Sequence, residues 1–183
     1  MIILKHFAKD CFVMRHAELL RMTYAHPDVL AHLLTDKKMT ASENERWYEE
    51  EYSRDTNHNI YFAHVDNTEK CVGIIDVRTE SLQNGIASIT VNPVAQYVDD
   101  MKLYIALTRI IRKELFETGI DDGFMYRKLI ARILARDGDR VAAVRELGFA
   151  REGLLKAHVR KGAVFHNVYQ MFSLNSDPVS WPA

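Results

Sequence analysis

The stretch "IASITVNPVAQYVDDMKLYIALTRII", Ile86 to Ile111, predicts a strand that passes through a short turn into a long helix. The strand is rich in β-branched residues and ends at Pro93, which has no N–H to continue a ladder. The helix is predicted from Asp99 to about Thr118, and Gly119 ends it. Because this helix is apolar around much of its circumference, we expect it to lie buried against a sheet.

Three strands before that helix are predicted to form an antiparallel meander. Each is a short run of β-branched and aromatic residues, and polar turns separate them. Asn84-Gly85 gives the sharper turn signal. The predicted strands are "IYFAHV" (Ile60 to Val65), "CVGIIDVRT" (Cys71 to Thr79) and "IASITVN" (Ile86 to Asn92).

The N-terminal residues predict one strand followed by helices. "MIILKHF" suits a short strand, and Asp10 is expected to cap a helix that reaches about Tyr24. A second helical segment is predicted in "DVLAHLLTD". Ser42 and Glu45 have the spacing of a capping box, which predicts a helix from Glu43 to about Arg54.

The C-terminal part of the chain predicts a strand, a short helix and a closing hairpin. "YRKLIARIL", Tyr126 to Leu134, fits a strand better than a helix. "DRVAAVRELG" is predicted to be a helix capped by Asp137 or Asp139, and two strands then meet at Lys161-Gly162. We expect one domain over residues 1–174 and a tail over residues 175–183.

Composition and charge indicate an ordinary globular protein without a membrane span. The chain has 183 residues, 48% of them hydrophobic and 27% charged, with a formal net charge of −1. Nothing in this balance draws the whole protein to nucleic acid or to a membrane surface. Cys11 and Cys71 lie far apart, so they predict free thiols rather than a disulfide framework or a zinc site. The absence of a long apolar segment or a cleavage site predicts a cytoplasmic protein.

The segment "RVAAVRELGFAREGLLKAHVRKGAVFHNVYQMFSL", Arg140 to Leu174, carries a resemblance to a known family. A short helix ends in Leu147-Gly148-Phe149, the pair Glu152-Gly153 follows, and a hairpin closes the chain. Together with the order of the other elements, this resembles the GNAT superfamily of N-acetyltransferases, in particular its ribosomal-protein and amino-sugar acetyltransferases. The resemblance implies an α+β fold with a mixed, mainly antiparallel central sheet and helices on both of its faces.

The resemblance also implies acetyl-CoA as co-substrate, bound in a V-shaped opening beside the third meander strand. A neutral amine of a small molecule or a protein would attack the thioester, helped by a general base and by a proton donor to the leaving thiol. No metal is implied. The cofactor-binding residues that the resemblance implies are Thr90, Val91, Gln96, Tyr97, Val98, Asp99, Asp100, Met101 and Asp137.

The loop that should hold the pyrophosphate departs from the family pattern. Relatives use Q/R-x-x-G-x-G/A, whose glycines let backbone N–H groups approach the phosphate. Gln96 keeps the first position, but Asp99 and Met101 occupy the glycine positions. Repulsion of a pyrophosphate by Asp99 and Asp100 is one interpretation. The favoured alternative is that these acids cap the helix and complement its dipole.

Other family positions differ as well. Val144 stands where relatives often place a tyrosine as proton donor to the CoA sulfur, and Asp137 replaces an asparagine. His166-Asn167 stands near a position that is often acidic. These changes affect the chemistry that the resemblance implies and leave the fold prediction intact.

Asp76 is the candidate general base. It alternates with Val72 and Ile74, so it is an acid on a largely apolar strand face, where burial would raise its pKa. The favoured alternative is that this face turns toward solvent beyond Ile74, since Arg78 and Glu80 follow.

The segment from Arg127 to Lys161 is basic and offers a further phosphate site. Arg136 and Arg140 flank the short helix, so either could hold a phosphate of CoA. A solvated basic face is the favoured alternative. Nucleic-acid binding is disfavoured because no aromatic platform or known module accompanies the charges.

Two functions from different classes follow. The leading hypothesis is an acyl-CoA-dependent N-acetyltransferase, and the rival is a GNAT-like binding protein that has lost acetyl-CoA chemistry. The free edges of such a sheet often pair between subunits in this superfamily, so a homodimer is a further expectation.

Overall fold

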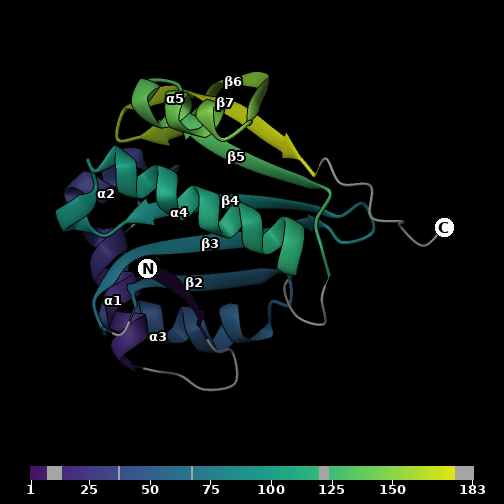
Figure 1. Ribbon diagram of the computed structural model, residues 1–183. Coiled ribbons are helices and arrows are strands. Elements are labelled where there is room, and N and C mark those ends of the chain that lie inside the picture. Colours follow the sequence, from purple (N-terminus) through teal and green to yellow (C-terminus); the bar gives the residue numbers. More distant parts are fainter. Residues whose placement is uncertain (8–13, 37, 67, 120–123, 176–183) are drawn as a thin grey trace.

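A seven-stranded sheet in the order β1-β2-β3-β4-β5-β7-β6 forms the centre of the protein (Figure 1). The computed structural model describes residues 1–7, 14–36, 38–66, 68–119 and 124–175. All neighbouring strands in the sheet are antiparallel except β4 and β5, which run parallel. The strands are β1 (Ile2–His6), β2 (His58–Val65), β3 (Cys71–Ser81), β4 (Ile86–Pro93), β5 (Lys128–Leu134), β6 (Ala150–Lys161) and β7 (Val164–Leu174).

Helices cover both faces of this sheet. On one face α4 packs along the central strands and α5 packs beside it, while α1 and α3 lie on the other face (Figure 1). The predicted α+β fold with flanking helices is therefore confirmed. The helices are α1 (Met14–Ala25), α2 (Pro27–His32), α3 (Ala41–Glu50), α4 (Met101–Lys113) and α5 (Gly138–Glu146).

Alternation along each strand divides the core into two layers. On β2, Tyr61 and Ala63 pack in the cluster under α4, whereas Ile60 and Phe62 pack in the cluster with α1 and α3. Successive residues of a strand point to opposite faces, so each face of β2 fills one layer. Asp76 follows Ile74 by two residues and therefore belongs to the α1–α3 face.

The long helix keeps its predicted position but not its uniform geometry. It begins at Met101 with Asp100 as N-cap, runs as α-helix to Lys113, and its last turn, Glu114–Thr118, is a π-helix. Gly119 ends it with φ 80°, a left-handed region that favours glycine.

The capping box at the start of α3 lies two residues before the predicted one. The capping box expected at Ser42 and Glu45 is wrong by two residues. Thr40 accepts from the Glu43 N–H at 3.3 Å, and the Glu43 carboxylate accepts from the Thr40 N–H at 2.8 Å, so α3 starts at Ala41. The same S/T-x-x-E spacing occurs twice in the sequence, and only the first pair lies at the helix start. The cap predicted at Asp10 lies outside the described residues.

The strand predicted near Tyr126 is confirmed as β5, and it gives the sheet its opening. β4 and β5 pair from Ile86 with Lys128 to Ile89 with Ala131. In the described chain no pair between these strands follows, although β4 continues to Pro93 and β5 to Leu134. The two strands therefore diverge after Ile89, and a notch opens between their C-terminal halves.

No described helix combines the length and the apolar character that a membrane span requires. Over the same residues, no group of three or more histidine, cysteine or acidic side chains is placed to hold a metal ion.

Candidate active site at the β4–β5 notch

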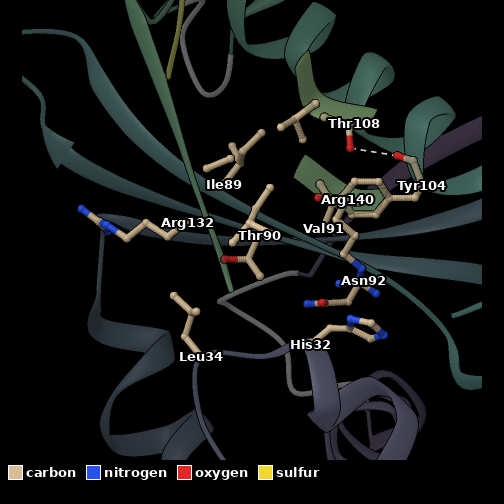
Figure 2. A pocket seen from close by; sticks show the side chains of 13 residues that line it. His32, Leu34, Ile89, Thr90, Val91, Asn92, Tyr104, Thr108, Arg132 and Arg140 are labelled. Atoms are coloured by element: carbon tan, nitrogen blue, oxygen red, sulfur yellow. Dashed lines mark hydrogen bonds between the residues drawn. The ribbon is translucent and has the colours of Figure 1, made fainter. Parts of the chain in front are cut away.

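The notch between the diverging strands contains a small cavity of about 30 Å³, room for one or two water molecules (Figure 2). Thr90 and Val91, two of the predicted cofactor-binding residues, line it from β4. Tyr104 of α4 and Arg140 of α5 line it from the helical side. The notch is thus narrow because two large side chains fill its helical side.

Arg140 and Tyr104 form a stacked pair in the notch. The guanidinium carbon of Arg140 lies 5.0 Å from the centroid of the Tyr104 ring, and both residues are 5% exposed. Burial raises the pKa of the Tyr104 hydroxyl to about 12, although the guanidinium acts in the opposite direction. Burial also lowers the pKa of Arg140, but arginine remains charged at any physiological pH.

Two buried polar groups in this cavity lack hydrogen-bond partners. Among the described residues, Nη2 of Arg140 has none, and neither does the side-chain amide of Asn92, which is 1% exposed. Both residues line the notch cavity (Figure 2). An unsatisfied buried polar group costs about 1–3 kcal/mol, and more when it is charged. A cavity that gathers two such groups is suited to a polar ligand.

A second and larger cavity, of about 510 Å³, opens on the α1–α3 side of the sheet. Tyr24, Met39 and Trp47 supply apolar surface, and three arginines and three acids supply charge. This cavity shares part of its lining with the notch, including Thr90 and Asn92. The two cavities therefore meet at the end of β4.

Asp76 lies in the larger cavity and is held by a buried histidine. Its Oδ2 is 2.8 Å from Nε2 of His58, which is 3% exposed. Arg78 donates from Nη2 to Nδ1 of the same ring at 3.2 Å. A guanidinium can only donate, so Nδ1 accepts and Nε2–H donates to the Asp76 carboxylate. Thr90 is the partner of Asp76 in the β3–β4 ladder, which places the carboxylate beside the notch.

The alternative for Asp76 is that this face of β3 turns to solvent after Ile74. The face becomes exposed only at Arg78, the next residue on it after Asp76. The side chain of Asp76 is 19% exposed, whereas that of Arg78 is 55% exposed. The base assignment stays a prediction.

Tyr24 adds a buried hydroxyl to the same cavity. Burial, and then the negative charge of Asp76, raise the pKa of this hydroxyl far above its ordinary value, and the charge of Arg78 opposes them only in part. Tyr24 therefore stays protonated, and it can donate a hydrogen bond to a bound molecule.

The predicted pyrophosphate loop is a short 3-10 turn followed by a capped helix start. Asp100 accepts a hydrogen bond from the Leu103 N–H at 3.0 Å, so one of the free N–H groups is already satisfied. Asp99 and Gln96 are exposed. The capping alternative is thus correct for Asp100, and Asp99 makes no capping bond among the described residues.

The remaining loop residues have structural contacts. Val98 packs in a buried cluster with Val29 and Leu30. Tyr97 lies under the ammonium of Lys70, with Nζ 5.1 Å from the ring centroid, and Met101 packs against the main core. The structure therefore gives these three residues packing roles and leaves their contact with a cofactor a prediction.

Asp137 stands at the N-cap position of α5, but within the described chain its carboxylate does not cap the helix. It lies 2.9 Å from Nδ1 of His32, with its side chain 9% exposed. This contact joins α2 to α5 across the end of the notch. The prediction that the Asp137 side chain caps α5 is wrong, because its carboxylate is paired with the His32 ring instead.

The basic segment is not a continuous solvated face. Lys128 pairs with Glu152 at 2.5 Å, and Arg132 pairs with Glu80 at 2.8 Å. Arg140 is buried, so the solvated-face interpretation is wrong for this residue. The favoured interpretation fits exposed members such as Arg145.

Comparison with solved structures identifies the architecture. A spermidine N-acetyltransferase from Vibrio cholerae, in complex with CoA and spermine, has a TM-score of 0.80, 12% identity and coverage of 96% of both chains. The chain has the GNAT fold. Mutant forms of the spermidine/spermine N-acetyltransferase from Vibrio cholerae give a TM-score of 0.72 at 14% identity, again over 96% of both chains. A protein provisionally described as a phosphinothricin N-acetyltransferase gives 0.73 at 14% identity, over 97% of this chain and 100% of the other.

No protein-family model and no curated protein matches the sequence. The GNAT assignment therefore rests on the three-dimensional arrangement, and at these identities it establishes the fold alone.

Sequence reasoning missed His58, Asn92 and Tyr104 as site residues. Asn92 had the clearest signal, since it is a polar residue at the end of an otherwise apolar strand before Pro93. His58 becomes a site residue only through the pairing of β2 with β3, which places it opposite Arg78. Tyr104 gave no signal beyond a helical apolar stripe.

Proposed function

We propose that this protein transfers the acetyl group of acetyl-CoA to an amine. The observation that carries the proposal is the junction of the two cavities at Thr90 and Asn92, with a held carboxylate on one side and unsatisfied donors on the other. The GNAT fold supports this use of the junction, and the neighbours in that fold are described as N-acetyltransferases.

The donors in the notch fit an acyl-CoA, whereas the loop before α4 fits it poorly. Arg140 and Asn92 offer N–H groups that need acceptors. The loop offers Asp99 and an N-terminus already capped by Asp100. When bound, acetyl-CoA supplies an activated acyl carbon. Thr90 and Val91 border the notch, so they remain our proposed cofactor contacts on β4.

Asp76 is the proposed general base. Its carboxylate accepts the Nε2–H of His58, which leaves further lone pairs for the proton of an amine. His58 is held by Arg78 and by burial, so the carboxylate keeps a fixed direction toward the cavity. A positioned base of this kind contributes typically about 10²–10⁴-fold to rate.

The larger cavity is suited to a small-molecule amine. Its volume of about 510 Å³ lies in the range of small-ligand pockets, roughly 300–1,000 Å³. Of its three acids, Asp76 and Glu80 already face Arg78 and Arg132, and only Glu51 has no ion pair among the described residues. A long polycation, such as the spermine in the Vibrio cholerae complex, carries several positive charges, and one free carboxylate would leave most of them unpaired. We therefore favour an acceptor with one amine and an apolar or anionic remainder over a polyamine or a protein amine.

The rival function is a GNAT-fold binding protein without acetyl transfer. The narrow notch and the acids of the loop favour it, because a cavity of about 30 Å³ holds only one or two water molecules and the loop carries Asp99 and Asp100. The large cavity would then serve as a ligand site on its own.

Titration with acetyl-CoA separates the two functions. A ligand that binds only the folded state raises the melting temperature, by about 2.7 kcal/mol of stability at a concentration of 100 times Kd. We expect such a shift with acetyl-CoA, and acetylation of at least one amine in a panel of small amines. A flat melting temperature at millimolar acetyl-CoA contradicts the proposed function and supports the rival.

We also propose that two copies pair through the exposed β6–β7 hairpin. Leu154 on β6 and Val164 and Phe165 on β7 are exposed apolar side chains, 41%, 57% and 63%. Strand β6 is the last in the sheet order, so its outer edge is free among the described strands. Light scattering of wild-type protein and of Phe165→Ser tests this, and a monomeric wild-type protein contradicts it.

A further inference from the structure

Helix α5 brings a charged side chain, in place of a hydroxyl, into the notch. Val144 occupies the position at which relatives often place a tyrosine, and it lines the notch with no exposed surface. Arg140 lies four residues earlier, so it projects from the same face of the helix one turn away. It lines the same cavity (Figure 2).

The Arg140 guanidinium is buried without a full counter-charge. No carboxylate lies within 4.0 Å of it among the described residues, and Nη2 has no hydrogen-bond partner there. Asp137 and Asp99 act on it only through their electrostatic field. A buried charge of this kind is costly unless an anion completes the site.

The arrangement of the cavities, taken with the proposed function, points to one kind of anion. The acceptor cavity, with Asp76, lies on the α1–α3 side of the sheet, and the notch with Arg140 opens from the same junction toward α4 and α5. An amine in the acceptor cavity would add to an acyl carbon held at the junction of the two cavities, and the sulfur of that acyl group would then lie on the notch side. The leaving group of an acyl-CoA is a thiolate.

We propose that Arg140 stabilises the thiolate of coenzyme A as it leaves. This inference rests on the proposed function. In the step, the amine nitrogen forms a bond to the acyl carbon, the carbon–sulfur bond breaks with its electron pair on sulfur, and the amine proton passes to Asp76. The guanidinium carries the charge that a tyrosine proton would otherwise neutralise, and the Tyr104 ring holds the guanidinium in place.

The thiol of bound coenzyme A reports this interaction without any acceptor. A nearby cation favours a thiolate, so the pKa of the CoA thiol should fall on binding, as protein thiols do beside arginine or lysine. The experiment measures thiolate absorbance near 240 nm across a pH titration of the protein–CoA complex. A thioether analogue of CoA, which has no thiol, supplies the blank for the cysteines of the protein.

We expect the pKa of the CoA thiol to fall by about one unit or more in wild-type protein and to return to its free value in Arg140→Gln. Arg140→Lys keeps the charge, so it should retain most of the shift. Arg145→Gln removes an exposed arginine from the same helix and should behave as wild type. Melting curves of all variants check that each one is folded.

The outcomes are distinguishable. Failure of wild-type protein to bind CoA contradicts the proposed function and this inference together. Binding with an unshifted thiol, or an equal shift in wild type and Arg140→Gln, overturns only the role of Arg140. A loss of CoA affinity in Arg140→Gln with an unchanged thiol shift also overturns it, because Arg140 would then hold a phosphate.

Discussion

The carboxylate of Asp76 lies 2.8 Å from Nε2 of His58, and the same ring accepts a hydrogen bond from Arg78. These three side chains come from two neighbouring strands, so the β2–β3 ladder alone holds the group together. Such support keeps a base in a fixed direction, which a loop would do less well. The fold itself therefore fixes the direction of the Asp76 carboxylate.

Replacing the proposed base should remove transfer and leave binding intact. For Asp76→Asn we expect acetylation of the best amine of the panel to fall by about 10²–10⁴-fold. Binding of acetyl-CoA, measured by calorimetry, should stay within about twofold because Asp76 faces the acceptor cavity. Glu51→Gln is the matched control, since it removes another carboxylate from that cavity. Full activity in Asp76→Asn would assign the base to another group.

Helix α4 should weaken when its cap is removed. Asp100→Ala deletes the acceptor of the Leu103 N–H, and loss of an N-cap costs about 1 kcal/mol. Urea denaturation measures this as a lower midpoint with an unchanged slope. Asp99→Ala is the control, because Asp99 is exposed and does not cap the helix; equal losses in both variants would contradict the assignment of the cap.

The exposed carboxylate of Asp99, in the loop before α4, should weaken the binding of CoA. We expect Asp99→Asn to tighten CoA binding several-fold at low ionic strength, because it removes a negative charge beside the predicted phosphate position. The gain should shrink in 1 M salt, where the Debye length is about 3 Å. Glu117→Gln changes an exposed acid at the other end of the same long helix and should leave affinity unchanged. If the affinity for CoA were the same in Asp99→Asn and in wild type, the phosphates of CoA would not lie beside this loop.

Strand β3 approaches α4 closely at Gly73. A Cβ there would lie 2.5 Å from Cδ1 of Leu107, which is fully buried, and 3.3 Å from the carbonyl oxygen of Asn92. We expect Gly73→Ala to cost about 1–3 kcal/mol of unfolding free energy, as overpacking does. Gly153→Ala is the comparison, since its Cβ would have no described neighbour within 4 Å. Similar denaturation midpoints for the two variants would contradict this packing argument.

Stability should decrease in mild acid because two neighbouring histidines are held neutral. Burial lowers the pKa of His16 and of His64, and the cations Lys5 and Arg15 act in the same direction. The unfolded chain therefore binds protons first as the pH falls below about 6.5. Proton binding by the unfolded state lowers the stability of the fold, so the loss begins below that pH and is absent above it.

Urea unfolding at pH 7.5 and pH 5 measures this loss. His64→Leu removes one of the two groups, so the difference between the two pH values should become smaller. His158→Gln, an exposed histidine of β6, should keep the wild-type difference. An unchanged difference in His64→Leu would place the acid sensitivity elsewhere.

The strands and the long helix were predictable because apolar residues recur at the spacing that is typical of each kind of element. The alternation of Val72, Ile74 and Asp76 was enough to place the acid on one face of β3. The turn at Gly119 and the strand β5 followed from equally local signals. The first residue of α3 could not be chosen from the sequence, because Thr40 and Ser42 each stand three residues before a glutamate and both fit a capping box.

The side chains that complete the site depend on contacts between distant segments. Arg140 was expected at the surface because its segment is rich in basic residues, and only the packing of α5 against α4 brings it over Tyr104. Asp137 meets His32, which lies 105 residues away in the chain. Neither contact leaves a periodic signal in the sequence, so neither could be predicted from it.

The Asp100 carboxylate lies at the first turn of α4, where it accepts the Leu103 N–H. In a glycine loop, the positive end of the following helix is neutralised by the anion that binds there. Here the chain supplies that negative charge itself, because Asp100 caps the first turn of α4. Ordering of the helix therefore needs no bound anion, and under the proposed function recognition of an acyl-CoA would fall to the notch between β4 and β5.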